Sequence, residues 1–334
     1  MGWWQVGADT LAGSRFTVSP LAETTGALTS LARGAPALPA ERAWLDAHLP
    51  AYRARLAADP VTAELVRAAL GRTWIADFLA RPPLPAAVTA RSTPDVAEEL
   101  PAVRDTPPDA ARADLAVALR GPLPPVLADR DDLPGRAADL LEWVWAETVR
   151  PYWPRRRRVL EADVLARTDA VSRGGWAAAL DGMGGGLRWL GRGRLRINAH
   201  DNPPRRITDA ELAFVPVTAR HGWVAWHTGA EESPARYAVV YPCAGLLAEP
   251  ERTPAPEALG RLLGPGRAAV LVALDSPKST THLVALTGLA LGSVGRHLRV
   301  LLDARLVGRR RAGRSVLYFR TPAGDTLVAA QRER

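Results

Sequence analysis

Several features that would assign a chain to a familiar class are scarce or absent in these 334 residues. Cysteine occurs once, at Cys243, which excludes an internal disulfide and fits a reducing compartment. No run of about 18 apolar residues is present, so we expect no membrane span. Residues 1–5 lack a basic segment followed by an apolar one, which argues against a secretory signal. These absences together predict a cytoplasmic protein.

The motifs of common enzyme classes are missing as well. There is no Gly-x-Ser-x-Gly segment to present a nucleophilic serine. The glycine-rich stretch 182–186 lacks the Gly-Lys-Ser/Thr sequence of a phosphate-binding loop. His200, His221, His227 and Cys243 share one region, but their spacing matches no compact metal-ligand pattern. We therefore expect no enzymatic activity, no metal and no other cofactor.

The positive charge of the chain is concentrated at one end. The net charge is +8, and residues 257–334 contain 13 basic and 5 acidic side chains, which accounts for the whole surplus. Residues 1–256 contain 30 of each kind. Of the basic residues, 42 are arginine and one is lysine, so the choice of arginine at any single position says little. A basic field confined to one small domain is typical of a protein that binds a polyanion.

Periodicity divides the chain into three regions and predicts an α+β fold. Residues 1–171 are mostly helical, with apolar periodicity at 41–56, 60–79, 139–149 and 155–171 and proline clusters between the helices. Residues 172–249 contain short β-rich runs at 194–198, 211–217, 223–226 and 237–241, from which we expect a small antiparallel sheet packed against the helices. Residues 250–334 follow a proline-rich linker at 246–256 and form a third, compact region.

Two short helices and a tight turn are predicted in the third region. Ser279 and Thr280 can cap a helix over 281–287, and Gly288 provides a turn before a second helix over 291–304. The buried face of the second helix is expected to contain Leu291, Val294, Leu298, Leu301 and Leu302. Its opposite face presents Gly292, Ser293, Arg296 and Arg299.

A basic β-hairpin follows at 308–320, with its turn at 312–313. A helix, a tight turn, a second helix and a basic hairpin together indicate a winged helix-turn-helix that binds duplex DNA. In such a unit Gly292 would allow close approach, Arg296 could pair with guanine, and the hairpin would contact the backbone. The residues expected to contact DNA are Thr280, Thr281, Gly292, Ser293, Arg296, His297, Arg299, Arg309, Arg310, Arg311 and Arg314.

These segments resemble the ArsR-type family of winged-helix repressors. The similar stretches are 257–263, 267–271, 280–283, 293–298, 301–304, 306–307, 313–318 and 321–325. The resemblance implies a homodimer that binds a two-fold operator and usually represses. The chain departs from the family pattern at Gly295, where serine is frequent, and at Ala290, which replaces a serine cap and should weaken the helix start. The first of the two helices has no cysteine and 322–334 has no histidine, so the family's metal sensing is not implied.

The N-terminal region resembles an uncharacterised domain often fused to ArsR-type readers, through residues 15–24, 153–154 and 161–163. The resemblance names no ligand. All eleven tryptophans precede residue 230. Seven of them could line a ligand pocket or belong to the core, namely Trp143, Trp145, Trp153, Trp176, Trp189, Trp223 and Trp226. The arginine run 155–158, with acidic residues close by, is interpreted as a solvated helix face.

We therefore predict a DNA-binding regulator whose N-terminal region responds to a small-molecule effector or holds the dimer together. The alternative is an enzyme or small-molecule-binding protein whose winged domain contacts another protein. The four arginines at the hairpin tip favour DNA, since a winged domain used only for protein contact has no need of them.

Overall fold

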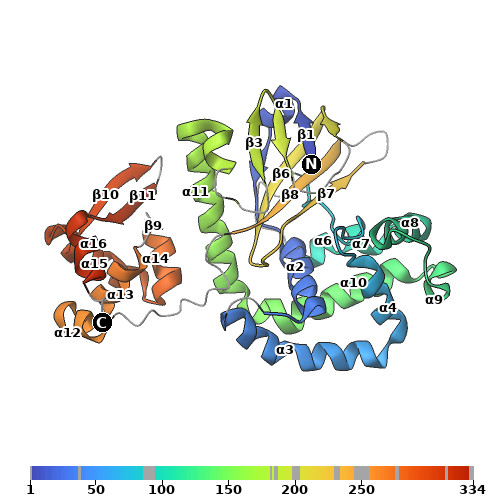
Figure 1. Ribbon diagram of the computed structural model, residues 1–334, viewed down its shortest axis with the longest axis horizontal. Coiled ribbons are helices and arrows are strands. Elements are labelled where there is room, and N and C mark those ends of the chain that lie inside the picture. The colour runs from blue at the N-terminus through green and yellow to red at the C-terminus, as the bar shows by residue number, and fades with distance from the viewer. Residues whose placement is uncertain are drawn as a thin grey trace.

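The computed structural model describes residues 2–36, 39–85, 95–180, 183, 187–197, 204–228, 234–243, 256–274, 278–312 and 315–330. It combines many helices with three small sheets, which is compatible with the predicted α+β class. Figure 1 shows two of the sheets above a group of helices, with the C-terminal elements on the other side of the long helix α11. In the described part of the chain, no helix is long and apolar enough to cross a membrane.

The helical group is formed by the N-terminal half of the chain. Its elements are α2 (Pro20–Arg33), α3 (Pro39–Ala58), α4 (Pro60–Ala69), α6 (Val96–Glu99), α7 (Pro101–Arg104), α8 (Pro108–Leu119), α9 (Pro125–Ala128), α10 (Leu133–Val144) and α11 (Trp153–Leu180). A π-helical turn (Trp145–Val149) and a 3-10 turn (Arg150–Tyr152) join α10 to α11. Several of these helices begin at proline, which has the right φ and lacks an N–H that would be unpaired there. The helix expected over 60–79 ends at Ala69, and a bridge between Leu70 and Ile75 follows.

Two mixed sheets replace the single antiparallel sheet that the sequence suggested, so that prediction was wrong. One has the strand order β3 (Arg188–Gly191), β4 (Arg194–Arg196), β1 (Trp3–Val6), β5 (Arg205–Ile207). The other has the order β2 (Arg15–Phe16), β6 (Ala210–Val217), β8 (Ala235–Pro242), β7 (Trp223–His227). Strand β8 lies between β6 and β7. It is parallel to β6 and antiparallel to β7. The near-continuous apolar run of β6, buried over its last six residues, is the signal of a parallel strand that period-two reasoning overlooked.

The N-terminus contributes strands as well as helices. Strand β1 lies between β4 and β5, and β2 pairs with β6; the short helix α1 (Ala8–Ala12) connects them. Trp4 is buried in the sheet core at 2% exposure, and the ring of Trp176 stacks on Phe16 with centroids 5.8 Å apart. Trp176, one of the tryptophans that could have lined a ligand pocket, therefore serves packing, as Trp4 does.

The arginine run at the start of α11 was expected to be exposed to solvent, and one of its four residues is buried instead. Arg156 is only 8% exposed, and its Nη1 lies 2.7 Å from Oε1 of Glu23, a fully buried carboxylate on α2. The same carboxylate accepts the backbone N–H of Thr218 at 2.8 Å and also the Thr218 hydroxyl. This buried ion pair joins α11, α2 and the end of β6. Helical periodicity could not reveal it because the partners are 133 and 195 positions apart.

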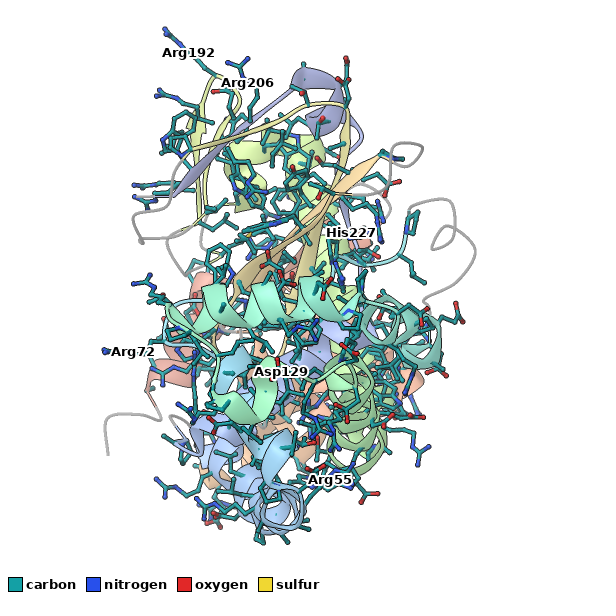
Figure 2. The ribbon with its side chains drawn as sticks, turned by 90° about the vertical axis from the view of Figure 1, so that its right-hand side faces the viewer. Arg55, Arg72, Asp129, Arg192, Arg206 and His227 are labelled. Atoms are coloured by element: carbon teal, nitrogen blue, oxygen red, sulfur yellow. The ribbon has the colours of Figure 1, made fainter. Side chains whose placement is uncertain are left out.

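Figure 2 shows the helices and the two mixed sheets of the N-terminal part from the side, with their side chains. The sheets lie above the helices, with Arg192 and Arg206 pointing away at the sheet end and Arg72 pointing outward beside the helices.

The C-terminal elements are α12 (Glu257–Leu263), α13 (Pro265–Ala273), β9 (Lys278–Ser279), α14 (Thr280–Thr287), α15 (Leu291–Asp303), β10 (Val307–Ala312), β11 (Ser315–Arg320) and α16 (Pro322–Ala329). They enclose their own core, which includes Leu271, Leu283, Val294, Leu298 and Val307. Helix α14 packs beside α11, whereas α15 lies on the far side of this group (Figure 1). Of the expected linker 246–256, only Pro256 is among the described residues.

Candidate nucleic-acid interface

The turn between α14 and α15 depends on Gly288. Its φ of 69° lies in the left-handed region, which glycine enters without steric cost. The N–H of Gly288 donates to the carbonyl of Val284 at 3.0 Å, which closes the last turn of α14. Leu289 then packs against the C-terminal core, as expected for a residue that fills the corner. The glycine is required for its backbone angle and not for space, since no atom lies within 4 Å of where a Cβ would stand.

The first turn of α15 is exposed and has no side-chain cap. Ala290 occupies the N-cap position with extended backbone angles. Its methyl side chain offers no acceptor for the N–H groups of the first turn, which confirms the expected uncapped start. Leu291, which we had placed on the buried face, is 60% exposed, so that assignment was wrong. As the first helical residue, Leu291 lies before the point where α15 reaches the core.

The two faces of α15 separate cleanly after its first residue. Val294, Leu298 and Leu301 are at most 1% exposed, while Leu302 is partly buried against the same core. On the opposite face Gly292, Arg296 and Arg299 are exposed, and Ser293 is half-buried.

His297 turns toward α13 instead of joining the outer face. A Cβ placed on Gly266, in the first turn of α13, would lie 2.5 Å from Nε2 of His297, so the imidazole covers this glycine. Burial, together with the charges of Arg267 and Arg296, lowers the pKa of His297 below its usual range. A neutral, half-buried ring attracts phosphate little, so of the two roles that the sequence allowed for His297, packing or a phosphate contact, the geometry favours packing.

The hairpin that follows is a regular antiparallel pair extended by a third strand. Strands β10 and β11 pair from Val307↔Arg320 to Ala312↔Ser315, and β9 joins β11 through Leu317↔Ser279. Ser279, which we expected to cap α14, is thus a strand residue, and Thr280 begins the helix.

Two of the four arginines assigned to the hairpin tip can be placed. Arg309 and Arg310 are exposed and adjacent on β10, so their side chains leave opposite faces of the hairpin. Arg314, together with the side chains of Arg311 and Thr281, lies outside the described part of the chain.

No protein-family model, no curated protein and no solved structure matches this chain. Among the described residues, no group of three or more His, Cys, Asp or Glu side chains is placed to hold a metal ion.

Proposed function

We propose that the chain is a sequence-specific DNA-binding transcriptional regulator, and that α12–α16 form a winged helix-turn-helix. In this proposal α14 and α15 are the helix pair and β10–β11 is the wing. The resemblance to ArsR-type repressors adds that the protein acts as a homodimer and usually represses, and the scarcity of cysteine adds a cytoplasmic location.

The observation that carries this proposal is a set of exposed arginines without acidic partners. Arg296, Arg299, Arg309 and Arg310 make no ion pair with any residue that the structure describes. The N-terminal part is different, since many of its partly exposed arginines bind carboxylates, as Arg136 binds Asp132 at 2.6 Å. Unpaired guanidinium groups on one small domain create a positive potential suited to the phosphates of a polyanion.

Helix α15 has the features that a helix needs to enter the major groove. Gly292 is exposed and has open space where a Cβ would stand, so a DNA backbone or base edge could approach closely. Arg296 follows one turn later, in the segment that reaches base edges in such units, and its guanidinium can donate to O6 and N7 of guanine. Arg299 lies about 4.5 Å further along the helix axis, where a phosphate contact is more accessible.

The experiment that tests the proposal compares single arginine variants of the full chain. Binding to the DNA upstream of the gene and to unrelated DNA is measured by fluorescence anisotropy over a range of salt concentrations. Arg296→Ala should weaken specific binding by about one to two decades, because a bidentate base contact contributes about 1–3 kcal/mol, and should change unrelated binding much less. Arg299→Ala should weaken both alike.

The matched control is Arg72→Ala, which removes an exposed arginine beside the helices of the N-terminal part (Figure 2) and should leave both affinities unchanged. The paired variant Arg309→Ala with Arg310→Ala should lower the slope of log affinity against log salt by about 1 for each phosphate that the hairpin no longer neutralises. Wild-type affinity in the Arg296, Arg299 and hairpin variants would contradict the proposed interface. Equal wild-type affinity for all DNA sequences would contradict sequence-specific regulation.

A further inference from the structure

A polar hollow lies far from α15, between the C-terminal half of α2, the start of α3 and the turn that follows β6. About 30 Å³ of it is accessible to the centres of water molecules, within about 320 Å³ of empty space that includes open solvent. It is lined by Gly26, Thr29, Ser30, Arg33, Ala35, Glu41, Ala219, Arg220 and His221. Gly26 lets the turn lie directly on α2, since a Cβ there would be 2.7 Å from that of Ala219. The hollow is thus built from segments nearly two hundred residues apart.

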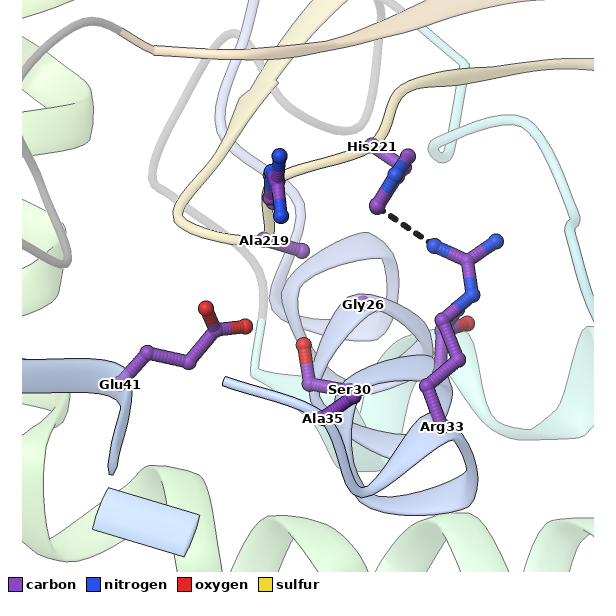
Figure 3. A pocket seen from close by; sticks show the side chains of 9 residues that line it. Gly26, Ser30, Arg33, Ala35, Glu41, Ala219 and His221 are labelled. Carbon is purple, nitrogen blue, oxygen red and sulfur yellow. Dashed lines mark hydrogen bonds between the residues drawn. The ribbon is translucent and has the colours of Figure 1, made fainter. Parts of the chain in front are cut away.

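Opposite charges line opposite sides of this hollow. Figure 3 shows the Glu41 carboxylate pointing into the space from one side, with the Arg33 guanidinium and the His221 ring together on the other. Glu41 is 4% exposed, so its carboxylate is fixed within the fold. Arg33 and Arg220 make no ion pair with any described residue. The hydroxyl of Ser30 points into the space between the two sides (Figure 3).

The histidine on the cationic side acts as a neutral hydrogen-bonding group. Nη1 of Arg33 donates to Nδ1 of His221, which requires an unprotonated Nδ1. Burial first, and then the charges of Arg33 and Arg220, lower the pKa of His221 below its usual range. Nε2 of the neutral ring therefore carries a proton and can donate to an anionic group alongside the two arginines.

We propose that this hollow binds a small zwitterion of the amino-acid type, which carries one carboxylate and one ammonium group. The carboxylate would be held by Arg33, Arg220 and the Ser30 hydroxyl, and the ammonium group by Glu41. Guanidinium pairs with carboxylate in a planar, bidentate geometry. A phosphate ligand fits less well, because its second negative charge would face the fixed Glu41 carboxylate.

Both sides of the hollow are connected to the buried ion pair of α11. The turn with Arg220 and His221 follows directly after Thr218, which is bonded to Glu23, the partner of Arg156. On the other side, Trp44 lies one helical turn after Glu41 on α3, and its ring centroid is 5.4 Å from the Arg156 guanidinium. Helix α11 packs in turn beside α14. A ligand that draws the two sides together therefore acts on the helix that contacts the C-terminal group.

Ligand binding is tested by isothermal titration calorimetry on the full chain, without DNA. The probes are the twenty proteinogenic amino acids, acetate, methylammonium and inorganic phosphate. At least one amino acid should bind, and acetate and methylammonium should bind at least about tenfold more weakly, since each lacks one charge-assisted contact. No binding by any amino acid, or tighter binding of phosphate than of every amino acid, would overturn the assignment.

Three variants locate the site, each checked for folding by circular dichroism. Arg220→Ala should weaken the amino acid and acetate at least about tenfold, because it removes a partner of the carboxylate that both probes share. Glu41→Gln should weaken the amino acid by a similar factor and leave acetate unchanged. Arg72→Ala is the control and should bind as the wild type does. If Glu41→Gln fails to fold, the Arg220→Ala variant still tests the site, because Arg220 is exposed and its replacement does not disturb the core. Undiminished amino-acid binding in Arg220→Ala would overturn the site.

The coupling of ligand binding to DNA binding rests on the proposed function, and it is tested separately by measuring operator affinity. Saturation with the amino acid found by calorimetry should change operator affinity at least about threefold in the wild type, and not in Arg220→Ala. An unchanged operator affinity in the liganded wild type would overturn the coupling through α11 while the binding site stands. If the chain binds no DNA at all, the proposed function and its regulation are wrong, and the calorimetric result still decides the site.

Discussion

The uncapped start of α15 allows a stability prediction that does not depend on function. Ala290 has φ −62° and ψ 146°, extended angles close to those of Thr321 (φ −79°, ψ 169°), which caps α16 through its hydroxyl. Ala290 is exposed, so a serine there meets no steric obstacle. Its hydroxyl would reach the backbone N–H groups of the first turn, which are otherwise poorly satisfied.

The expected gain for Ala290→Ser follows from these contacts. An N-cap serine stabilises a helix by about 1 kcal/mol relative to alanine. The N–H of Ser293 already has a partner in the carbonyl of Ala290, at 2.9 Å, so the gain should lie at about 0.5–1 kcal/mol. That free energy corresponds to about two- to fivefold slower amide exchange over the helix.

Hydrogen exchange with mass spectrometry on peptides covering 291–303 measures this change locally, which a global unfolding curve of a chain this long would not. Ala290→Val is the control, because valine also favours an extended backbone but offers no acceptor. The reciprocal variant Thr321→Ala should speed exchange in α16 about fivefold, since it loses the bond to Gly324 N–H at 3.3 Å. Equal protection of α15 in the serine and valine variants would refute the reasoning.

Three further outcomes are expected. Burial raises the pKa of Glu99 from its ordinary 4.5 to about 7, so the folded state keeps a proton that the unfolded state releases. The contribution of Glu99 to the free energy of unfolding should therefore fall by on the order of 2–3 kcal/mol between about pH 5 and about pH 7, and urea unfolding should show a slope that is shallower by this amount in Glu99→Gln. Gly266→Ala should cost about 1–3 kcal/mol by overlap with His297, and the added change His297→Ala should recover part of it in a double-mutant cycle of urea midpoints. Arg305 has a φ of 55°, so Arg305→Gly should slow exchange at the end of α15 by relieving up to about 1 kcal/mol; an unchanged rate would mean that the backbone carries no strain there.

Local pattern was sufficient for the helix pair and the hairpin of the C-terminal group. The 3.6-residue spacing of Val294, Leu298 and Leu301 fixed the buried face of α15, and Gly288 fixed the turn before it. Leu291 escaped this reasoning because periodicity cannot tell where along its length a helix first reaches the core. The packing partner of His297 could not be predicted, because the space that its ring fills is left by a glycine on another helix.

The sequence by itself determined the positions of the helix pair α14–α15, the hairpin and the surplus of positive charge, because each depends on residues close together along the chain. Only the tertiary structure decided that β6 and β8 run parallel, since the direction of a strand depends on the edge to which the chain returns. It also decided that Arg156 is buried against Glu23, and that Arg33 meets His221 across 188 positions. Charges of either sign occur throughout residues 1–256, and the fold alone selects which of them face one another across a hollow.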